Sequence, residues 1–141
     1  MKQKTVKYTP EFISALAPNQ VFVFGSNLAG VHGAGAAETA LRKFGAAWGE
    51  GIGHHGNSYA IPTKGQRIET LPRLVIAYFV DDFLDYAASR LDLEFLVTPV
   101  GCGLAGYTPE DIAPLFLKGP RIPTSNVIFP RNFYPQNQLT K

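Results

Sequence analysis

The sequence is poor in cysteine, in charge and in long hydrophobic runs. A single cysteine, Cys102, excludes a framework of internal disulfides and favours a reducing compartment. No stretch reaches the roughly 18 apolar residues that a membrane span requires. The first twelve residues lack the apolar core of a signal peptide. We therefore expect a cytoplasmic protein without a membrane partner.

Charged residues make up only 17% of the 141 residues, and the formal net charge is +2. The basic residues are scattered, so they do not form the dense stripe of proteins that track a nucleic-acid backbone. The scattered charge does not exclude local phosphate binding, because a few backbone amides suffice to hold a phosphate. Hydrophobic residues make up 45% of the chain, which at this length is enough for one core and predicts a single domain over residues 1–141.

Glycine, proline and asparagine divide the chain into short apolar runs and longer periodic segments. Strands are predicted at 21–24, 58–61, 94–100 and 127–129, and helices at 9–16, 36–44, 71–91 and 108–117. Pro62 is expected to end the second strand, and residues 49–56 are expected to form a flexible loop beside the site. This alternation predicts an α/β fold with a mainly parallel sheet and helices on both faces.

The helix predicted over 71–91 shows apolar side chains at steps of three and four, which predict one buried face. These residues are Leu71, Leu74, Val75, Tyr78, Phe79, Phe83 and Tyr86. The helices at 9–16 and 108–117 both open on Thr-Pro-Glu, in which threonine is a good N-cap and proline suits the first turn.

Two glycine loops, at residues 25–37 and 101–107, each follow a predicted strand. Ligands of such folds bind at the carboxyl ends of the strands, so we expect both loops to border one cleft. The first loop also leads into a helix, whose free N–H groups and dipole favour an anion. The alternative is that these glycines serve only the close packing of helix on sheet.

Two familiar phosphate-binding motifs are matched only in part by this sequence. Gly25 and Gly30 have the spacing of a P-loop, but Val31 and His32 stand where lysine and serine or threonine belong. Residues 51–56 match G-x-G-x-x-G, yet they follow a helix and precede a strand, the reverse of the dinucleotide-binding context. The neighbouring His54 and His55 lack further ligands in zinc spacing, so no metal site is predicted.

Two side chains near the strand ends are candidates for chemistry. Lys64 lies just beyond the second strand, where it either points into the cleft or is an exposed loop lysine. Cys102 stands at a strand end, a position typical of nucleophiles, but a catalytic thiol needs a histidine partner and only His32 comes from the facing loop.

Three separated stretches resemble the macrodomain family, whose members bind ADP-ribose and in many cases hydrolyse ADP-ribose linkages. They are Val-Phe-Gly-Ser-Asn at 23–27, Gly-Ala-Gly-Ala-Ala at 33–37 followed by Arg-Lys-Phe-Gly at 42–45, and Thr-Pro-Val-Gly-Cys-Gly-Leu at 98–104. The resemblance extends over about residues 21–129 and implies a three-layer α/β/α macrodomain-like fold. It further implies ADP-ribose or an ADP-ribosylated target as partner, and no cofactor.

The resemblance also implies a set of ligand-binding residues in the two loops. These are Gly25, Ser26, Asn27, Gly33, Ala34, Gly35, Ala36, Gly101, Cys102, Gly103, Leu104, Ala105, Gly106 and Tyr107. The backbone amides would hold the diphosphate, and Asn27 would contact the distal ribose. Tyr107 would close over that ribose, and Phe133 would stack on adenine.

The closest subclass releases terminal ADP-ribose from acidic side chains, with a lysine nucleophile at the place of Lys64. That subclass carries an aspartate after Gly-Cys-Gly-Leu, where this chain has Ala105. Lys64 would attack C1″ of the ribose if burial leaves its amine neutral. Alternatively a phosphate-held water attacks, assisted by His32 or Glu38. The resemblance thus leaves two functions: an ADP-ribosyl glycohydrolase, and a non-catalytic reader of ADP-ribose or a related nucleotide.

Overall fold

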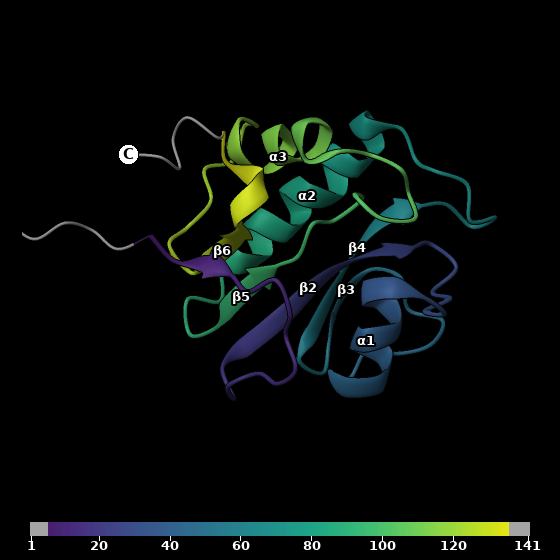
Figure 1. The fold of residues 1–141 in the computed structure, drawn as a ribbon, viewed down its shortest axis with the longest axis horizontal. Helices are drawn as coiled ribbons and strands as arrows, with labels where there is room; N and C mark the ends of the chain where they lie inside the picture. The colour runs from purple at the N-terminus through teal and green to yellow at the C-terminus, as the bar shows by residue number, and fades with distance from the viewer. Residues whose placement is uncertain (1–5, 136–141) are drawn as a thin grey trace, which may run out of the picture.

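The six strands of the computed structural model, which describes residues 6–135, form one sheet with helices on both faces (Figure 1). The strands are β1 (Tyr8–Thr9), β2 (Gln20–Asn27), β3 (Gly53–His55), β4 (Ser58–Lys64), β5 (Glu94–Val97) and β6 (Val127–Pro130). The helices are α1 (Gly35–Lys43), α2 (Arg73–Ala88) and α3 (Pro109–Leu117), and a 3₁₀ turn, η1 (Arg131–Phe133), follows β6. The predicted α/β class with a mainly parallel sheet is confirmed.

The strand order is β1-β6-β5-β2-β4-β3, and every neighbouring pair is parallel except β3 with β4. Five strands therefore end at the same edge of the sheet, in the order β1, β6, β5, β2, β4. The two glycine loops leave this edge from β2 and β5, as predicted. That shared edge is where parallel α/β sheets bind ligands.

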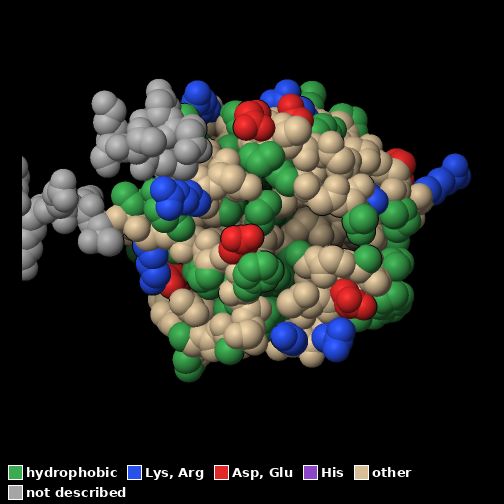
Figure 2. Space-filling model, viewed as in Figure 1, with side chains coloured by type: hydrophobic (Ala, Val, Ile, Leu, Met, Phe, Trp, Pro, Cys, Tyr) green, Lys and Arg blue, Asp and Glu red, His purple; other side chains and the backbone are tan. Residues whose placement is uncertain are grey.

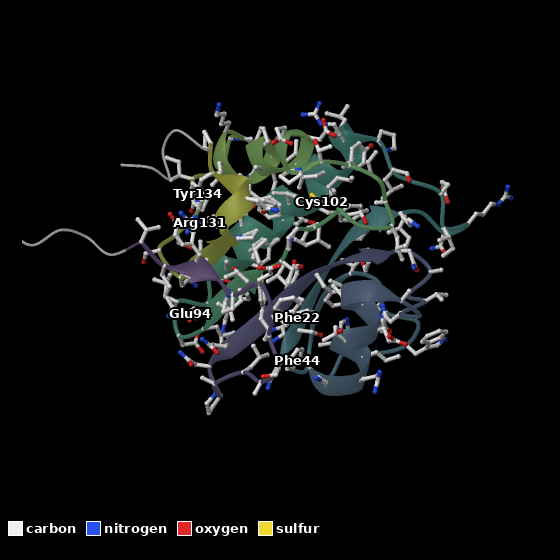
Figure 3. The ribbon with its side chains drawn as sticks, in the orientation of Figure 1. Phe22, Phe44, Glu94, Cys102, Arg131 and Tyr134 are labelled. Carbon is white, nitrogen blue, oxygen red and sulfur yellow. The ribbon has the colours of Figure 1, made fainter. Side chains whose placement is uncertain are left out.

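Alternate side chains of β2 belong to two different cores. Val21 and Val23 pack with α2 and α3 on one face of the sheet, and Phe22 and Phe24 pack with α1 on the other. The ring centroids of Phe22 and Phe44 lie 4.9 Å apart between β2 and α1 (Figure 3). Burial on both faces explains why β2 reads as a continuous apolar run rather than an alternating one. No helix within residues 6–135 combines the length and the apolar character that would let it cross a membrane.

The prediction of a helix over residues 9–16 is wrong. Thr9 belongs to β1, which pairs with β6, and its hydroxyl donates to the carbonyl of Ile128 at 3.0 Å. Ile13 and Leu16 then pack against the α1 side of the sheet from irregular backbone. The Thr-Pro-Glu pattern fits a helix start, but pairing with a strand more than a hundred residues away prevails.

Two boundaries around β4 also differ from prediction. The segment expected to be a flexible loop contains β3, which pairs with β4 from Gly53 opposite Ala60 to His55 opposite Ser58. Pro62 does not end β4, which continues to Lys64. Strand β3 pairs with β4 only as far as Ala60, so Pro62 has a neighbouring strand, β2, on one side only. Its missing N–H therefore breaks no hydrogen bond to a second strand.

Helix α2 is present, and its predicted buried face is right in part: Phe83 is buried, and Phe79 and Tyr86 pack against the core. The buried residues of α2 are Ile76, Val80, Phe83, Leu84 and Ala87. Leu74 is 83% exposed, and Val75 and Tyr78 are exposed as well. The first half of α2 is apolar on nearly every side, so the spacing of apolar residues is compatible with more than one buried face.

Candidate functional site

A cavity of about 440 Å³ opens at the carboxyl ends of β2, β4 and β5. Its lining residues are Gly25, Ser26, Asn27, Val31, Gly33, Ala34, Gly35, Ala36, Ala37, Thr63, Lys64, Ile68, Thr98, Pro99, Gly101, Gly103, Leu104 and Ala105. The volume falls in the range of small-molecule pockets, roughly 300–1,000 Å³. The face in Figure 2 is hollowed right of centre, with backbone and uncharged side chains around the hollow. The structure thus brings the two glycine loops together at one cavity.

The first loop presents the N-terminus of α1 to this cavity. Ala34 is the N-cap residue, in extended conformation, and supplies no side-chain acceptor. The N–H groups that open a helix have no intrahelical partner, and the dipole places about half a positive charge there. Gly35 has φ +62° and open space before it, since an added Cβ would meet nothing within 4 Å. The start of α1 therefore offers free amide donors to an anion.

The side chain of Asn27 fixes the first loop as well as lining the cavity. Its Oδ1 accepts from the amide of Val31 at 2.9 Å, and its Nδ2 donates to the carbonyl of Val31 at 2.8 Å. Ser26 donates its hydroxyl to the carbonyl of Gly51 and so ties β2 to the next loop. An amide side chain has two donor hydrogens and two acceptor lone pairs, so Asn27 keeps one of each for a ligand.

The second loop approaches β2 closely through two glycines. A Cβ added to Gly25 would lie 3.2 Å from the amide nitrogen of Gly101, and Gly101 itself has φ +76°. Thr70 donates its hydroxyl to the carbonyl of Ala105 at 3.0 Å, which ties this loop to the turn after β4. Larger residues at these two glycines would push the second loop away from the cavity floor.

Lys64, at the end of β4, is the one charged residue that the described part of the chain contributes to the cavity lining. Its carbonyl accepts from the amide of Leu28 at 2.9 Å, which fixes the backbone. No carboxylate of residues 6–135 forms an ion pair with its amine. The predicted position of Lys64 at the cleft is thus the position that the structure gives it.

His32 and Glu38, the candidates for assisting a water, do not line the cavity. His32 is only 1% exposed, and its Nε2 lies 3.0 Å from the carbonyl oxygen of Ala47 and 3.1 Å from that of Glu50. It ties the first glycine loop to the segment at 47–50. Glu38 is exposed in the first turn of α1. Both placements count against a part in acid–base chemistry.

Cys102 directs its side chain toward the α2–α3 side of the sheet (Figure 3), where it packs against the larger core. Burial raises the pKa of its thiol to about 11, and the charges of Asp111 and Glu110 add to that increase. The thiol is therefore protonated at neutral pH, when only the thiolate is a good nucleophile. The weak prediction of a cysteine nucleophile is not supported.

Three further expected residues lie outside the cavity lining. The hydroxyl of Tyr107 donates to the carbonyl of Leu71 at 2.7 Å, which fixes this ring against the segment before α2. Gly106 adjoins it, with φ +89°. Phe133 is 3% exposed and packs on Phe116, so it has no free face for adenine.

Sequence reasoning missed several residues of the lining. Three of them, Thr63, Thr98 and Pro99, lie at the carboxyl ends of strands β4 and β5. That position at a strand end is the sequence signal that could have identified them. Thr98 donates its hydroxyl to the carbonyl of Val23 at 2.7 Å and anchors the start of the second loop. Ile68, in the turn after β4, carried no recognisable signal.

A second cavity, of about 1020 Å³, adjoins the first. It lies at the carboxyl ends of β1 and β6 and shares Ala36, Thr98 and Pro99 with the first cavity. The guanidinium of Arg131, labelled in Figure 3, lies 5.9 Å from the ring centroid of Tyr8. Both residues border this cavity. The two cavities meet at these three shared residues, and we call the two together the groove.

His54 and His55 do not form the beginning of a metal centre in the part of the chain that is described. Within residues 6–135 no three histidine, cysteine or acidic side chains come together as a metal cluster. Nδ1 of His54 instead pairs with the hydroxyl of Tyr86. Burial, as the largest cause, lowers the pKa of His54.

No family model matches the sequence, and comparisons with curated proteins and with solved structures gave no match either.

Proposed function

We propose that this protein binds ADP-ribose, or the ADP-ribose group of a modified target, in the groove across the strand ends, as a macrodomain-like α/β/α protein. The observation that carries the proposal is the cavity between the open N-terminus of α1 and the second glycine loop. Among residues 6–135, its lining contains one lysine and no carboxylate. Such a cavity suits a diphosphate, because backbone N–H groups and a cation face the anion without a competing negative charge.

The order of strand ends supports one orientation of the ligand. The diphosphate lies between α1 and the loop after β5. The distal ribose points toward Asn27 and Lys64, at the ends of β2 and β4. The adenosine end then extends over β5 toward the second cavity, where Tyr8 and Arg131 offer an aromatic ring and a cation. This arrangement replaces Phe133 as the adenine contact.

Lys64 gives the proposal its candidate reaction. The ammonium of Lys64 would first lose a proton to solvent, and the amine would then form a bond to C1″ of the ribose as the bond to the acceptor breaks and the acceptor leaves with the electron pair. Water then releases ADP-ribose and restores the amine. Ala105 stands where the closest subclass has its acid, and His32 and Glu38 lie outside the lining. Among residues 6–135, the lining of this cavity therefore offers no carboxylate or imidazole to activate water. That absence favours a non-catalytic reader as the second candidate.

Binding is tested first, by thermal unfolding with ADP-ribose. A ligand at one hundred times its dissociation constant adds about 2.7 kcal/mol to the free energy of unfolding. We expect a concentration-dependent rise in Tm with ADP-ribose and a smaller one with AMP. No rise at millimolar ADP-ribose contradicts the proposal.

Release of ADP-ribose from a mono-ADP-ribosylated peptide then separates the two functions. A glycohydrolase releases ADP-ribose in the wild type and loses this activity in Lys64→Ala. Lys118→Ala, which changes an exposed lysine after α3 outside both cavities, is the matched control. A reader binds ADP-ribose and releases none in either protein.

A further inference from the structure

The lining of the first cavity includes three exposed apolar side chains. Val31, Ile68 and Leu104 are 40%, 42% and 72% exposed, and all three line the cavity. They come from the first glycine loop, the turn after β4 and the second glycine loop. We name these three residues the apolar collar. The rest of the lining consists of backbone, small or polar side chains, proline and Lys64.

Ile68 has an unfavourable backbone conformation. Its φ is +64°, and no other non-glycine residue between 6 and 135 has a positive φ. A β-branched residue is a marked outlier there, because its Cβ crowds the following carbonyl. Glycine or asparagine would accept this conformation at much lower cost.

The turn itself imposes that conformation. The amide of Gly65 donates to the carbonyl of Glu69 at 2.8 Å, and the amide of Ile68 donates to the carbonyl of Gly65 at 3.1 Å. A bridge between Lys64 and Thr70 closes the turn, and Thr70 also bonds to the second loop. The backbone at Ile68 is thus fixed from both sides, close to Lys64.

Folding does not explain why an isoleucine stands at this place. The side chain of Ile68 belongs to neither core cluster of the described residues. A bulky apolar side chain that is strained, exposed and turned into a cavity is typical of a functional position.

We propose that Ile68, with Leu104 and Val31, selects ligands that carry an uncharged apolar group on C1″ of the distal ribose. This inference rests on the proposed function. Ile68 follows Lys64 at the end of β4, whereas the second cavity lies at the opposite end of the strand order, over β1 and β6. A ligand with its adenosine in the second cavity therefore presents C1″ and its substituent to the apolar collar. Apolar contact there favours an uncharged substituent over a free carboxylate.

The experiment compares three probes by calorimetry: ADP-ribose, its stable 1″-O-benzyl glycoside and its 1″-O-carboxymethyl glycoside. We expect the wild type to bind the benzyl glycoside about tenfold more tightly than the carboxymethyl glycoside, which is the scale of one or two apolar contacts. In Ile68→Asn the ratio of the two affinities falls to about twofold or less. The Tm stays equal or rises, because asparagine tolerates the backbone conformation.

Leu104→Ser gives a second test outside the strained turn, and Leu91→Ser is its control at an equally exposed leucine outside the cavity. The inference expects Leu104→Ser to weaken the preference and Leu91→Ser to leave it. A preference that is absent in the wild type, or unchanged in Ile68→Asn, overturns the inference while ADP-ribose binding leaves the proposed function standing. Failure of all three probes to bind overturns both.

Discussion

Helices α1 and α3 both follow a glycine loop at the carboxyl edge of the sheet, but their N-termini are built differently. In α3 the hydroxyl of Thr108 accepts from the amide of Asp111 at 3.3 Å, and the carboxylate of Asp111 accepts from the amide of Thr108 at 3.0 Å. Pro109 opens the helix. In α1 the corresponding residue is Ala34, which offers no acceptor. One terminus is closed by its own side chains, and the other is open toward a cavity.

The difference indicates what each terminus is for. A side-chain N-cap contributes about 0.5–2 kcal/mol, so α1 forgoes a stabilisation that α3 has. Helix α2 also starts without a side-chain cap, at Pro72, but its first turn lines neither cavity. An open terminus therefore becomes a candidate site only where a cavity, a facing loop and a lysine accompany it, as at α1.

The largest expected effect comes from closing the open terminus with Ala34→Asp. Ala34 has φ −156° and ψ 161°, a conformation that an aspartate N-cap adopts. We expect the free energy of unfolding to rise by about 1 kcal/mol. We expect the affinity for ADP-ribose to fall at least about 100-fold, some 2.7 kcal/mol, because the carboxylate takes the amides and repels the diphosphate. Thermal unfolding and calorimetry measure the two changes.

Ala34→Ser is the uncharged counterpart of that variant. The serine caps α1 without adding negative charge, so the loss of affinity should be smaller, about tenfold. Unchanged ADP-ribose binding in Ala34→Asp, with the helix stabilised, would separate α1 from the ligand and remove the basis of the comparison.

An intermediate effect is expected from opening the closed terminus with Thr108→Ala. Loss of the cap on α3 should lower the free energy of unfolding by about 1 kcal/mol. The affinity for ADP-ribose should stay within twofold of the wild type, since Thr108 lines neither cavity. Denaturant unfolding and calorimetry on the same protein give both numbers. A large loss of binding would mean that the second loop depends on the cap of α3.

The smallest effect concerns Cys102 and alkaline pH. Its pKa is raised from 9.0 to about 11, so the folded protein holds this proton more tightly than the unfolded chain. The resulting stability is present below pH 9 and is lost as the pH rises to 11. We expect Tm to fall less steeply between pH 9 and 11 in Cys102→Ala than in the wild type. Equal slopes would contradict a raised pKa for the half-buried thiol in the second loop.

Much of the fold follows from local sequence signals. Continuous apolar runs between turn residues predict β2 and β5, and the Thr-Pro-Glu pattern at 108–110 predicts the capped start of α3. The same pattern at 9–11 fails, because pairing of Thr9 with β6 is a contact across the whole chain. The buried face of α2 could be predicted only in part, since Leu74, Tyr78 and their neighbours leave no clear polar side to mark the solvent.

The candidate site could likewise be predicted from the sequence only in part. Glycine loops after strands predict the position of Gly35, Gly101 and Lys64 at one edge, because parallel strands bring their ends together. The burial of His32 depends on two loops that meet only in the folded protein. Ile68 depends on a turn geometry that no sequence pattern announces.

The most direct test of the open terminus is an NMR titration of the wild-type protein with ADP-ribose, followed at the backbone amides. We predict the largest shifts at Ala36, Ala37 and the second loop around Gly103, with little change at Glu110 and Asp111 in the capped turn of α3. Shifts confined to other parts of the molecule, or none at millimolar ADP-ribose, would contradict the assignment of α1 as the anion site.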